Sequence, residues 1–349
     1  MKAAYLDTYR NFTWKETPDP EVKKGEALIR IQFASICGSD MHIFNGDFHP
    51  RTPIPFIPGH EMGGIVVETG EGVEGFAPGD KVAIDPIIWC GHCPACEQGH
   101  YPACTSLKLL GIDMDGGFCE YISVPSSMLY KAEKGVPDEH VALIEIYSVG
   151  FHANNRAGVK EGDTVVIWGA GRVGQVILQA ARTKTQNTIF MVDVLDNRLA
   201  IASNCYTNVV TINATKENPV DVIKAHTQNR GVDIGFEAVG HAQAVPDVPN
   251  PIRGCIQAIR GAGTVCVLGL SDEPVPVVFK EMIWKEAKIV ASRVNHGEFA
   301  EVLDCLRQGL LKPEALISKV MKAAEIQNAF ELLEQEKENY LKVLLDFRG

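Results

Sequence analysis

The sequence predicts an α/β protein of two domains, in which a doubly wound parallel sheet is inserted into a strand-rich domain. The chain has 349 residues, which is longer than one ordinary domain. From residue 162, short apolar runs alternate with helical periodicity, as is typical of a parallel sheet covered by helices on both faces. The residues before 150 instead show strand-like runs separated by glycine, proline and acidic turns. We therefore expect a strand-rich domain built from 1–150 and 285–349 and a parallel-sheet domain over 151–284.

Within the strand-rich part, residues 27–33 alternate apolar and polar side chains with the period of two of a half-buried strand. Helical periodicity first appears after Pro137. Further strands are predicted at 63–68, 81–84 and 120–124. Near the end of the chain we expect helices at 298–308 and 323–334 and a final strand close to Val343.

The parallel-sheet domain is predicted from five apolar runs, each followed or preceded by a helical stretch. The predicted strands lie at 164–168, 188–193, 208–212, 232–237 and 264–268. The first strand leads into a helix over 172–182.

Composition excludes several classes of function. The chain is 46% hydrophobic and 22% charged, which is typical of a globular protein with sizeable cores. Its formal net charge of −11 offers no basic field for nucleic acid or an anionic membrane. Apolar runs stay below the roughly twenty residues of a membrane span, and the first residues lack a signal-peptide core. We expect a cytoplasmic protein that binds neither membrane nor nucleic acid.

A glycine motif follows the first predicted parallel strand. Gly169, Gly171 and Gly174 fit G-x-G-x-x-G, with Arg172 and Val173 between the second and third glycines. In a dinucleotide site these glycines allow the tight turn, the approach of the pyrophosphate and close packing of helix on strand, and the helix start offers free N–H groups to phosphate.

An acidic residue lies about twenty residues beyond this turn, as such a site requires. Asp193 ends the second apolar run and would hold a ribose 2′-hydroxyl. Its charge would repel a 2′-phosphate, so the sequence predicts NAD rather than NADP. An ordinary strand-to-helix turn is the alternative for the glycines alone.

Four cysteines form the most specific pattern in the sequence. The spacing C-x2-C-x2-C-x7-C suits a closed tetrahedral Zn²⁺ site, because four thiolates leave no open position. The intervening residues are turn-like and poor in apolar side chains, so a metal would replace the missing core. An iron–sulfur cluster and free cysteines are the alternatives. The four residues are Cys90, Cys93, Cys96 and Cys104.

A second set offers one thiolate, one imidazole and one carboxylate. Cys37 and the pair His60-Glu61 lie in glycine-marked turns, each close to a predicted strand. A catalytic zinc needs three protein ligands and one exchangeable position. A lone cysteine is more often a small buried hydrophobe, so the spacing alone leaves both interpretations open.

These motifs together resemble the zinc-dependent medium-chain dehydrogenases, the family of alcohol, polyol and threonine dehydrogenases. The resemblance spans nearly the whole chain. It rests on C-G-S-D-M-H at 37–42, G-H-E-M-G-G at 59–64, G-D-K-V at 79–82, the four-cysteine lobe, and 169–174 with Asp193. It implies a strand-rich GroES-like catalytic domain and a Rossmann nucleotide-binding domain. It further implies two Zn²⁺ per subunit, NAD, an alcohol substrate and a homo-tetramer or homo-dimer.

The resemblance also implies roles for single residues. Cys37 and His60 correspond to the first two ligands of the catalytic zinc, and Glu61 to a carboxylate that binds the metal or lies directly behind it. Glu145 falls where the third ligand lies, and Ser39 and His42 correspond to the relay that carries the substrate proton to solvent. The four cysteines of the lobe correspond to the structural zinc. Arg198 corresponds to a cation near the adenosine ribose.

Two departures from the family pattern affect this transfer. Glu145 is followed by Ile146-Tyr147, where the polyol and threonine branches usually have Pro-Leu, so the pocket wall differs. Residues 243–261 contain Pro246, Pro249 and Pro251, where the family usually continues into a helix.

The predicted activity is oxidation of a secondary alcohol of a polyol or vicinal diol, with NAD as hydride acceptor. Zn²⁺ has no redox chemistry of its own, so the cofactor must take the electrons. The first alternative is oxidation of a 3-hydroxy amino acid, as in L-threonine 3-dehydrogenases. The second, from a different class, is a non-catalytic regulator that binds zinc and nucleotide.

Overall fold

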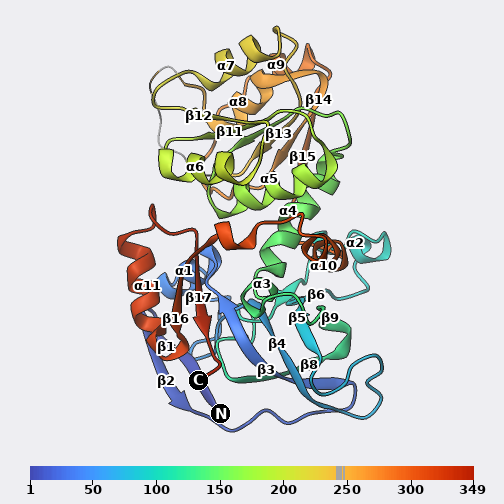
Figure 1. The fold of residues 1–349 in the computed structure, drawn as a ribbon, viewed down its shortest axis with the longest axis vertical. Helices are drawn as coiled ribbons and strands as arrows, with labels where there is room; N and C mark the ends of the chain where they lie inside the picture. Colours follow the sequence, from blue (N-terminus) through green and yellow to red (C-terminus); the bar gives the residue numbers. More distant parts are fainter. Residues whose placement is uncertain (241–245, 247) are drawn as a thin grey trace. The chain divides into compact units, whose positions relative to one another are not determined.

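The computed structural model describes all residues except 241–245 and 247. The chain forms two compact units, and both chain ends belong to the first (Figure 1). The first unit comprises Met1–Ile146, Phe299–Gly309 and Leu316–Gly349. The second comprises Tyr147–Glu298 and Leu310–Ala315.

A mixed sheet forms the core of the first unit. Its central strand β3 (Glu26–Ser35) pairs antiparallel with β4 (Glu61–Thr69), β8 (Tyr121–Pro125) and β17 (Lys342–Asp346). The apolar face predicted at 27–33 is confirmed, because Ala27, Ile29, Ile31 and Phe33 are fully buried. The remaining strands are β16 (Ile317–Lys322), β5 (Lys81–Ile84) and β9 (Leu129–Lys131).

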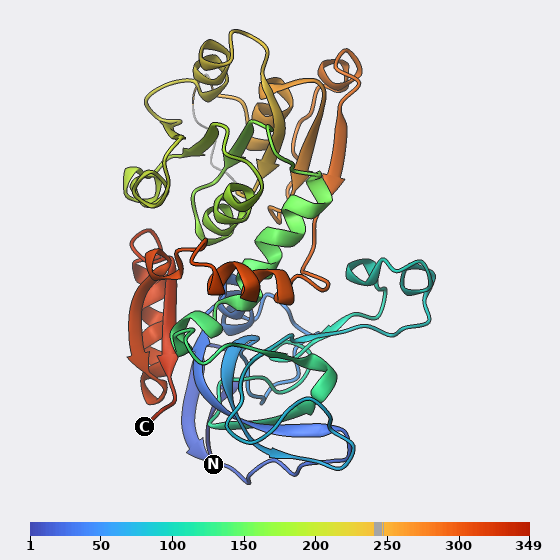
Figure 2. The ribbon, with the colours of Figure 1, turned by 45° about the vertical axis from the view of Figure 1, so that its right-hand side comes forward.

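Smaller elements complete the first unit. Two further strand pairs are β1 (Lys2–Thr8) with β2 (Asn11–Glu16) and β6 (Ile87–Ile88) with β7 (Lys108–Leu109). The helices are α1 (Gly38–Asn45), α2 (Pro94–Glu97), α3 (Asp138–Val141), α10 (Phe299–Arg307) and α11 (Ile326–Gln335). The predicted helices near 298–308 and 323–334 are thus confirmed, although the first turn of the latter is a 3₁₀ turn at Ala323–Glu325. Figure 2 shows the loop that carries α2 projecting as a separate lobe.

The second unit contains the predicted parallel sheet. Along the sheet the strand order is β12-β11-β10-β13-β14-β15, which is the doubly wound order 3-2-1-4-5-6. The strands are β10 (Val165–Trp168), β11 (Ile189–Asp193), β12 (Val209–Asn213), β13 (Val232–Glu237), β14 (Ile259–Val267) and β15 (Lys288–Ala291). The helices are α4 (Ile144–Ala157), which begins in the first unit, α5 (Arg172–Lys184), α6 (Asp196–Cys205), α7 (Pro219–His226), α8 (Pro251–Ala258) and α9 (Phe279–Ile283).

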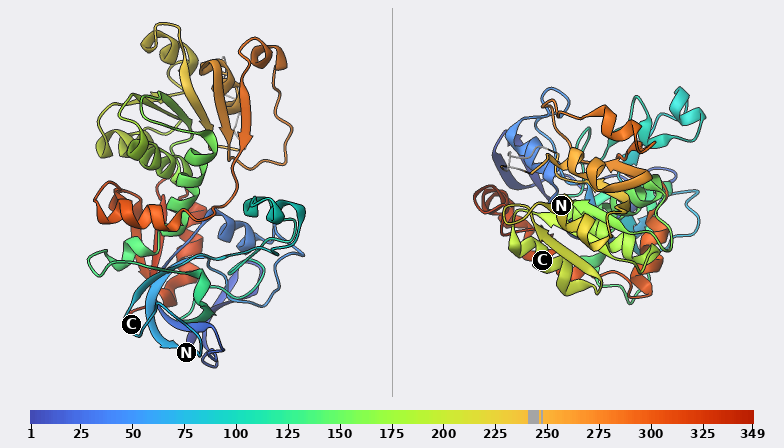
Figure 3. Two further views of the ribbon diagram at one scale, coloured as in Figure 1. Left: turned by 90° about the vertical axis from the view of Figure 1, so that its right-hand side faces the viewer. Right: turned by 90° about the horizontal axis from the view of Figure 1, so that it is seen from above.

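Helices cover both faces of this sheet (Figure 3), and buried apolar side chains lie on each side of its central strands. Side chains alternate along β10, so Val165 and Ile167 pack into one core while Val166 and Trp168 pack into the other. A strand covered on both faces needs apolar residues at every position, which explains the uninterrupted run Val165–Trp168.

The proline-rich segment 243–261 lies partly outside the described residues. Its later part forms α8, with Pro251 in the first turn and the Asn250 side chain accepting the Arg253 N–H at 3.0 Å. Proline is tolerated there because the first N–H groups of a helix have no partner within it. The helix between the fourth and fifth strands therefore exists in this chain.

Candidate active site in the first unit and dinucleotide-type turn in the second

The pairing of β3 with β4 brings two distant turns together. Ser35 at the end of β3 lies opposite Glu61 at the start of β4. Cys37 follows β3 by two residues and His60 immediately precedes β4, so both lie at the same end of the strand pair. Cys37 also caps α1, where its N–H donates to Asp40 Oδ2 at 2.8 Å.

The side chains of Cys37, His60 and Glu61 converge there. Their candidate ligand atoms all lie within 4.8 Å of one another. His60 is 4% exposed and Glu61 fully buried. The imidazole ring is oriented from both sides, because Asp40 Oδ1 lies 3.3 Å from Nδ1 and Ser39 Oγ lies 3.3 Å from Nε2. A carboxylate behind one imidazole nitrogen is the usual support for a histidine that binds metal through the other.

A buried lysine brackets the Glu61 carboxylate. Lys342 on β17 places Nζ at 2.6 Å from one Glu61 oxygen and 2.5 Å from the other, and neither residue is exposed. Burial alone would raise the pKa of Glu61, but the lysine charge outweighs it and the pKa is lowered. Sequence reasoning missed Lys342, because 281 positions separate it from Glu61 and its neighbours Val343 to Leu345 indicate only a core strand.

Glu145 lies near this group but outside the set of atoms within 4.8 Å. It is the second residue of α4 and is 6% exposed. Burial raises its pKa to about 8, and the charges of Glu61 and Cys37 act in the same direction against His60. Two carboxyl groups in one region therefore have opposite pKa shifts, lowered at Glu61 and raised at Glu145.

The donor set fits a zinc ion. Burial and Glu61 oppose ionisation of Cys37, yet His60 and Lys342 lower the pKa of its thiol. Burial likewise opposes protonation of His60, but Asp40 and Cys37 raise its pKa well above the ordinary value. The site thus stabilises a thiolate and a positive charge beside it, and a divalent cation would supply that charge. Sulfur, imidazole nitrogen and carboxylate oxygen are ligands that Zn²⁺ accepts.

His42 lies on the last turn of α1 and is not among the residues whose ligand atoms converge. Its Nδ1 lies 2.7 Å from Asp47 Oδ2, and its side chain is 61% exposed. Ser39, the other residue of the predicted relay, contacts His60.

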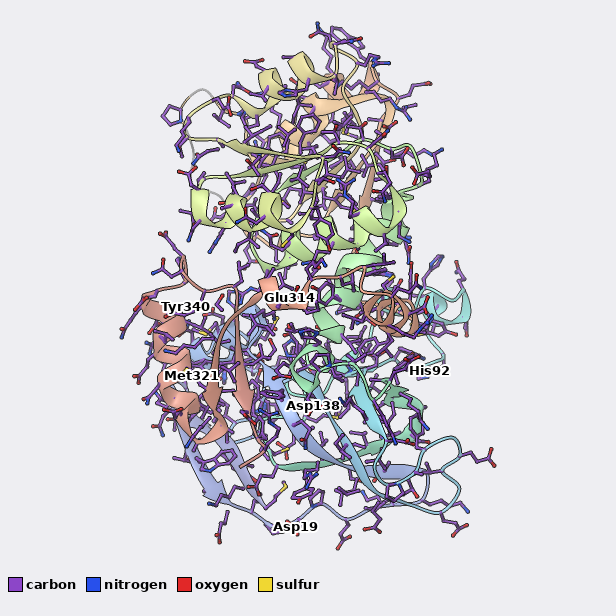
Figure 4. The ribbon with its side chains drawn as sticks, viewed as in Figure 1. Asp19, His92, Asp138, Glu314, Met321 and Tyr340 are labelled. Atoms are coloured by element: carbon purple, nitrogen blue, oxygen red, sulfur yellow. The ribbon has the colours of Figure 1, made fainter. Side chains whose placement is uncertain are left out.

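The four-cysteine lobe brings its thiols together as the spacing predicts. The sulfur atoms of Cys90, Cys93, Cys96 and Cys104 lie within 4.8 Å of one another. Backbone N–H groups of Cys96 and Thr105 lower the pKa of Cys93 to about 5, which favours a thiolate. His92, labelled in Figure 4, lies on the same lobe but is exposed and contacts the Cys90 carbonyl through Nδ1. Four thiols and a lobe with little core match a closed structural zinc site.

The glycine turn of the second unit has the geometry that the motif predicts. Gly169 has a φ of 99°, where a side chain would be strained, and a Cβ on Gly174 would lie 1.7 Å from the Gly169 carbonyl oxygen. Gly171 is the N-cap of α5, so Arg172 and Val173 begin the helix.

The carboxylate of Asp193 is fixed beside this turn. It accepts the N–H of Ala170 at 2.6 Å and those of Val194 and Leu195 at 2.7 and 3.0 Å. Arg198 on α6 lies across the turn, with Nη1 at 3.9 Å from the position that a Cβ on Gly171 would take. The turn therefore joins free helix N–H groups, one anchored acid and one arginine, a combination suited to a dinucleotide.

A doubly wound unit with a glycine turn, joined to a unit that gathers a Cys–His–Glu set and a four-thiol lobe, defines a zinc-type dehydrogenase. Two family models match the chain: the alcohol dehydrogenase GroES-like domain at residues 23–137 and the zinc-binding dehydrogenase model at residues 173–308.

Curated relatives match over almost the full length. The starvation-sensing protein RspB of Escherichia coli K12 is 31% identical over 99% of both chains. Sorbitol dehydrogenase of Bacillus subtilis 168 is 29% identical over 99% of this chain and 97% of its own. L-threonine 3-dehydrogenase of Bacillus velezensis is 31% identical over 92% of each chain.

Solved structures of similar proteins share this fold. A short chain alcohol dehydrogenase (rspB) from E. coli CFT073 complexed with NADH superposes with a TM-score of 0.88, at 30% identity over 99% of both chains. A zinc-binding dehydrogenase from Sinorhizobium meliloti 1021 bound to NADP superposes with the same TM-score, at 28% identity over 99% of this chain and 98% of that one. The chain belongs to the zinc-binding alcohol dehydrogenase family, and both the predicted family and the predicted fold class are confirmed.

Within the part of the chain that the structure describes, none of the helices has both the length and the apolar character needed to cross a membrane.

Proposed function

We propose that this protein oxidises a secondary alcohol of a polyol or vicinal diol by hydride transfer to NAD. The observation that carries the proposal is the convergence of Cys37, His60 and Glu61 in the first unit, with Ser39 beside the imidazole. The name of the sorbitol dehydrogenase relative supports a polyol as the class of substrate.

The chain's own residues divide the work of such a reaction. Cys37, His60 and either Glu61 or Glu145 would hold a catalytic zinc. When both groups are bound, zinc lowers the pKa of an alcohol hydroxyl and the nicotinamide accepts a hydride. The alcohol then loses one hydride and one proton and becomes a ketone. Asp40 and Lys342 orient the imidazole and the Glu61 carboxylate, and Ser39 and His42 would move the proton to solvent.

The second unit supports NAD as the acceptor. Gly169, Gly171 and Gly174 leave room for a pyrophosphate at the start of α5, and Arg172 and Val173 present the first N–H groups of that helix. Asp193 would receive the ribose hydroxyls, with Arg198 nearby. The similar structure from Sinorhizobium meliloti is bound to NADP, so family likeness alone does not select the cofactor. The feature of this chain that favours NAD is the anchored carboxylate of Asp193.

The test is a substrate panel with NAD and with NADP, using zinc-loaded protein and following the absorbance of the reduced cofactor. We expect NAD reduction with sorbitol or 2,3-butanediol and less with L-threonine or simple primary alcohols. The Cys37→Ser protein, folded but unable to complete the ligand set, is the matched control. A zinc-loaded protein that reduces neither cofactor with any alcohol would refute the proposal.

Oxidation of L-threonine is the second candidate, because one relative matched over 92% of its length is an L-threonine 3-dehydrogenase. The same panel separates the two, since a threonine enzyme would show its highest kcat/KM with the amino acid.

The remaining parts of the proposal concern metal content, assembly and compartment. We expect two Zn²⁺ per subunit, one at Cys37 and His60 and one at the four-cysteine lobe. Metal analysis of protein purified without chelator measures this, and active protein with one zinc or none would contradict it.

We also propose a homo-oligomer, a tetramer or dimer. None of the ten cysteines, all of which lie in the described part of the chain, forms a disulfide, which supports a reducing compartment such as the cytoplasm.

A further inference from the structure

We propose that Asp47 is a positioning residue of the proton path, which holds His42 in the tautomer that carries hydrogen on Nδ1 and leaves Nε2 to accept the substrate proton. The inference rests on the proposed dehydrogenase function, since it gives Asp47 a role only if His42 moves a proton.

The backbone at the end of α1 brings the carboxylate to the ring. The helix ends at Asn45, and Gly46 adopts the left-handed conformation with a φ of 88°. This turns the chain back, so the Asp47 N–H donates to the His42 carbonyl at 2.9 Å. Glycine is favoured at Gly46 because residues with a Cβ rarely adopt that conformation. Asp47 therefore lies two residues beyond the end of α1, bonded back to its last turn at His42.

The side chains then fix the ring. Asp47 Oδ2 lies 2.7 Å from Nδ1, and the Phe48 ring stacks on the imidazole with centroids 5.9 Å apart and planes 14° from parallel. An ionised carboxylate only accepts hydrogen bonds, so Nδ1 must carry the hydrogen. One face and the Nδ1 edge of the ring are occupied, while the side chain as a whole stays 61% exposed.

Other charged or titratable groups at this end of α1 are bound elsewhere. Arg10 pairs with Glu334 and also donates to Asn45. His49 contacts the Tyr9 hydroxyl at 2.9 Å through Nδ1. Among the residues that the structure describes, Asp47 thus supplies the charge in contact with the His42 ring, and it acts together with the negative end of the helix dipole.

The role of this pair is orientation rather than stability. Asp47 is 53% exposed, and exposed ion pairs contribute roughly 0–1 kcal/mol. A neutral imidazole without a partner can carry its hydrogen on either nitrogen. In serine proteases a carboxylate behind histidine likewise fixes the tautomer that the reaction needs. Asp47 would do the same for a histidine that lies on the surface.

The experiment compares zinc-loaded Asp47→Ala and Asp47→Glu proteins with the wild type. The matched control is Asp304→Ala, because Asp304 is equally exposed, also belongs to the first unit and pairs with Arg307. In Asp47→Ala we expect turnover to fall roughly tenfold, with zinc content and melting temperature unchanged. Nitrogen-15 NMR of labelled histidines should show His42 leaving the pure Nδ1–H tautomer. Asp47→Glu should recover most of the turnover and the tautomer, and Asp304→Ala should match the wild type.

Two further results separate the inference from the function on which it rests. His42→Gln identifies the His42 signals and tests the relay itself. If His42→Gln turns over like the wild type, the proposed relay fails. If His42→Gln is impaired but Asp47→Ala keeps the wild-type turnover or tautomer, the relay stands and the role of Asp47 is refuted. If Asp47→Glu is as impaired as Asp47→Ala, the proposed positioning of His42 by a carboxylate is also refuted.

Discussion

Two buried carboxyl groups near the same imidazole behave in opposite ways, because one has a cation in contact with both its oxygens. Lys342 lowers the pKa of Glu61, whereas burial raises the pKa of Glu145 to about 8. In the metal-free site these shifts favour the ionised form of Glu61 and the protonated form of Glu145. A metal cation bound beside Glu145 would favour its ionised form. Metal binding at this site would therefore release a proton.

Glu145 should make the stability of the metal-free protein depend on pH. A carboxyl group whose pKa is higher in the folded state stabilises the fold below its unfolded pKa, and this contribution is lost as pH rises through the folded pKa. The free energy of unfolding should thus fall by up to a few kcal/mol between about pH 4.5 and pH 8. Urea unfolding of chelator-treated protein across this range measures the effect.

Glu145→Gln is the control, because glutamine keeps the shape and cannot titrate. Its unfolding free energy should change less over the same pH range. A wild type and a glutamine variant with parallel pH dependences would show that Glu145 does not hold a proton in the folded state.

At the scale of residues, sequence reasoning identified the side chains that carry the chemistry but not those that orient them. Cys37 and His60 lie in short motifs with recognisable neighbours, and the structure places them together. Asp40 accepts the Cys37 N–H as a capping residue does, but nothing in the local sequence indicates its approach to His60. Lys342 has no local signal, because its partner on β4 is brought to it by the pairing of β3 with both β17 and β4.

Among the elements, the lobe that carries α2 depends most on its metal. Cys96→Ser should remove about one of two zinc ions and lower the thermal stability, because metal binding supplies folding free energy to a segment with little core. Calorimetry together with metal analysis measures both. Cys205→Ser, at a half-buried cysteine outside the lobe, is the control and should leave both unchanged. Loss of turnover with unchanged stability in Cys96→Ser would mean that the roles of the two sites are reversed.

The end of β11 should decide between the two nicotinamide cofactors. Three backbone N–H groups fix the Asp193 carboxylate, so Asp193→Asn removes the charge while keeping the size of the side chain. We expect weaker NAD binding and a smaller advantage of NAD over NADP, because the repulsion of a 2′-phosphate disappears. Affinities from fluorescence titration of both cofactors test this. Equal affinity for the two cofactors in the wild type would contradict the assignment.

Elements with strong periodicity were predicted within a few residues, and the misses have physical causes. The first four strands of the parallel sheet are apolar over most of their length and were recognised. The fifth, β14, begins at Ile259, five residues before the predicted start, with a register shift against β13. β15 was not predicted, because its apolar run is only three residues long, Ile289–Ala291. α1 was interpreted as a turn, since its eight residues begin with Gly38, Ser39 and Asp40.

At the scale of the whole molecule, the chain forms two compact units and passes between them four times. The first unit is built from both ends of the chain, and the second includes the short return segment Leu310–Ala315. Such an insertion is visible in the sequence only as a change from period-two runs to alternating strands and helices, which occurs near residue 162.

The surface of the second unit leads to a prediction about assembly. Large apolar side chains gather on α9 and just after it: Phe279, Ile283 and Trp284 are 72, 70 and 77% exposed. They precede β15, which ends the sheet as an edge strand. Exposed apolar surface of this kind beside an open strand edge is typical of a contact between protein chains. A closed homo-oligomer would bury it by using the same surface on both copies.

Trp284→Glu should therefore reduce the size of the assembly, because a charge would be buried without a partner at the centre of such a contact. Light scattering coupled to size-exclusion chromatography measures the mass, and metal analysis and circular dichroism establish that the variant is folded. Val320→Glu is the matched control, since Val320 is a 45% exposed apolar residue on β16 in the first unit. A wild type that is monomeric at micromolar concentration would exclude the homo-oligomer. An unchanged mass for Trp284→Glu beside an oligomeric wild type would place the contact on another surface.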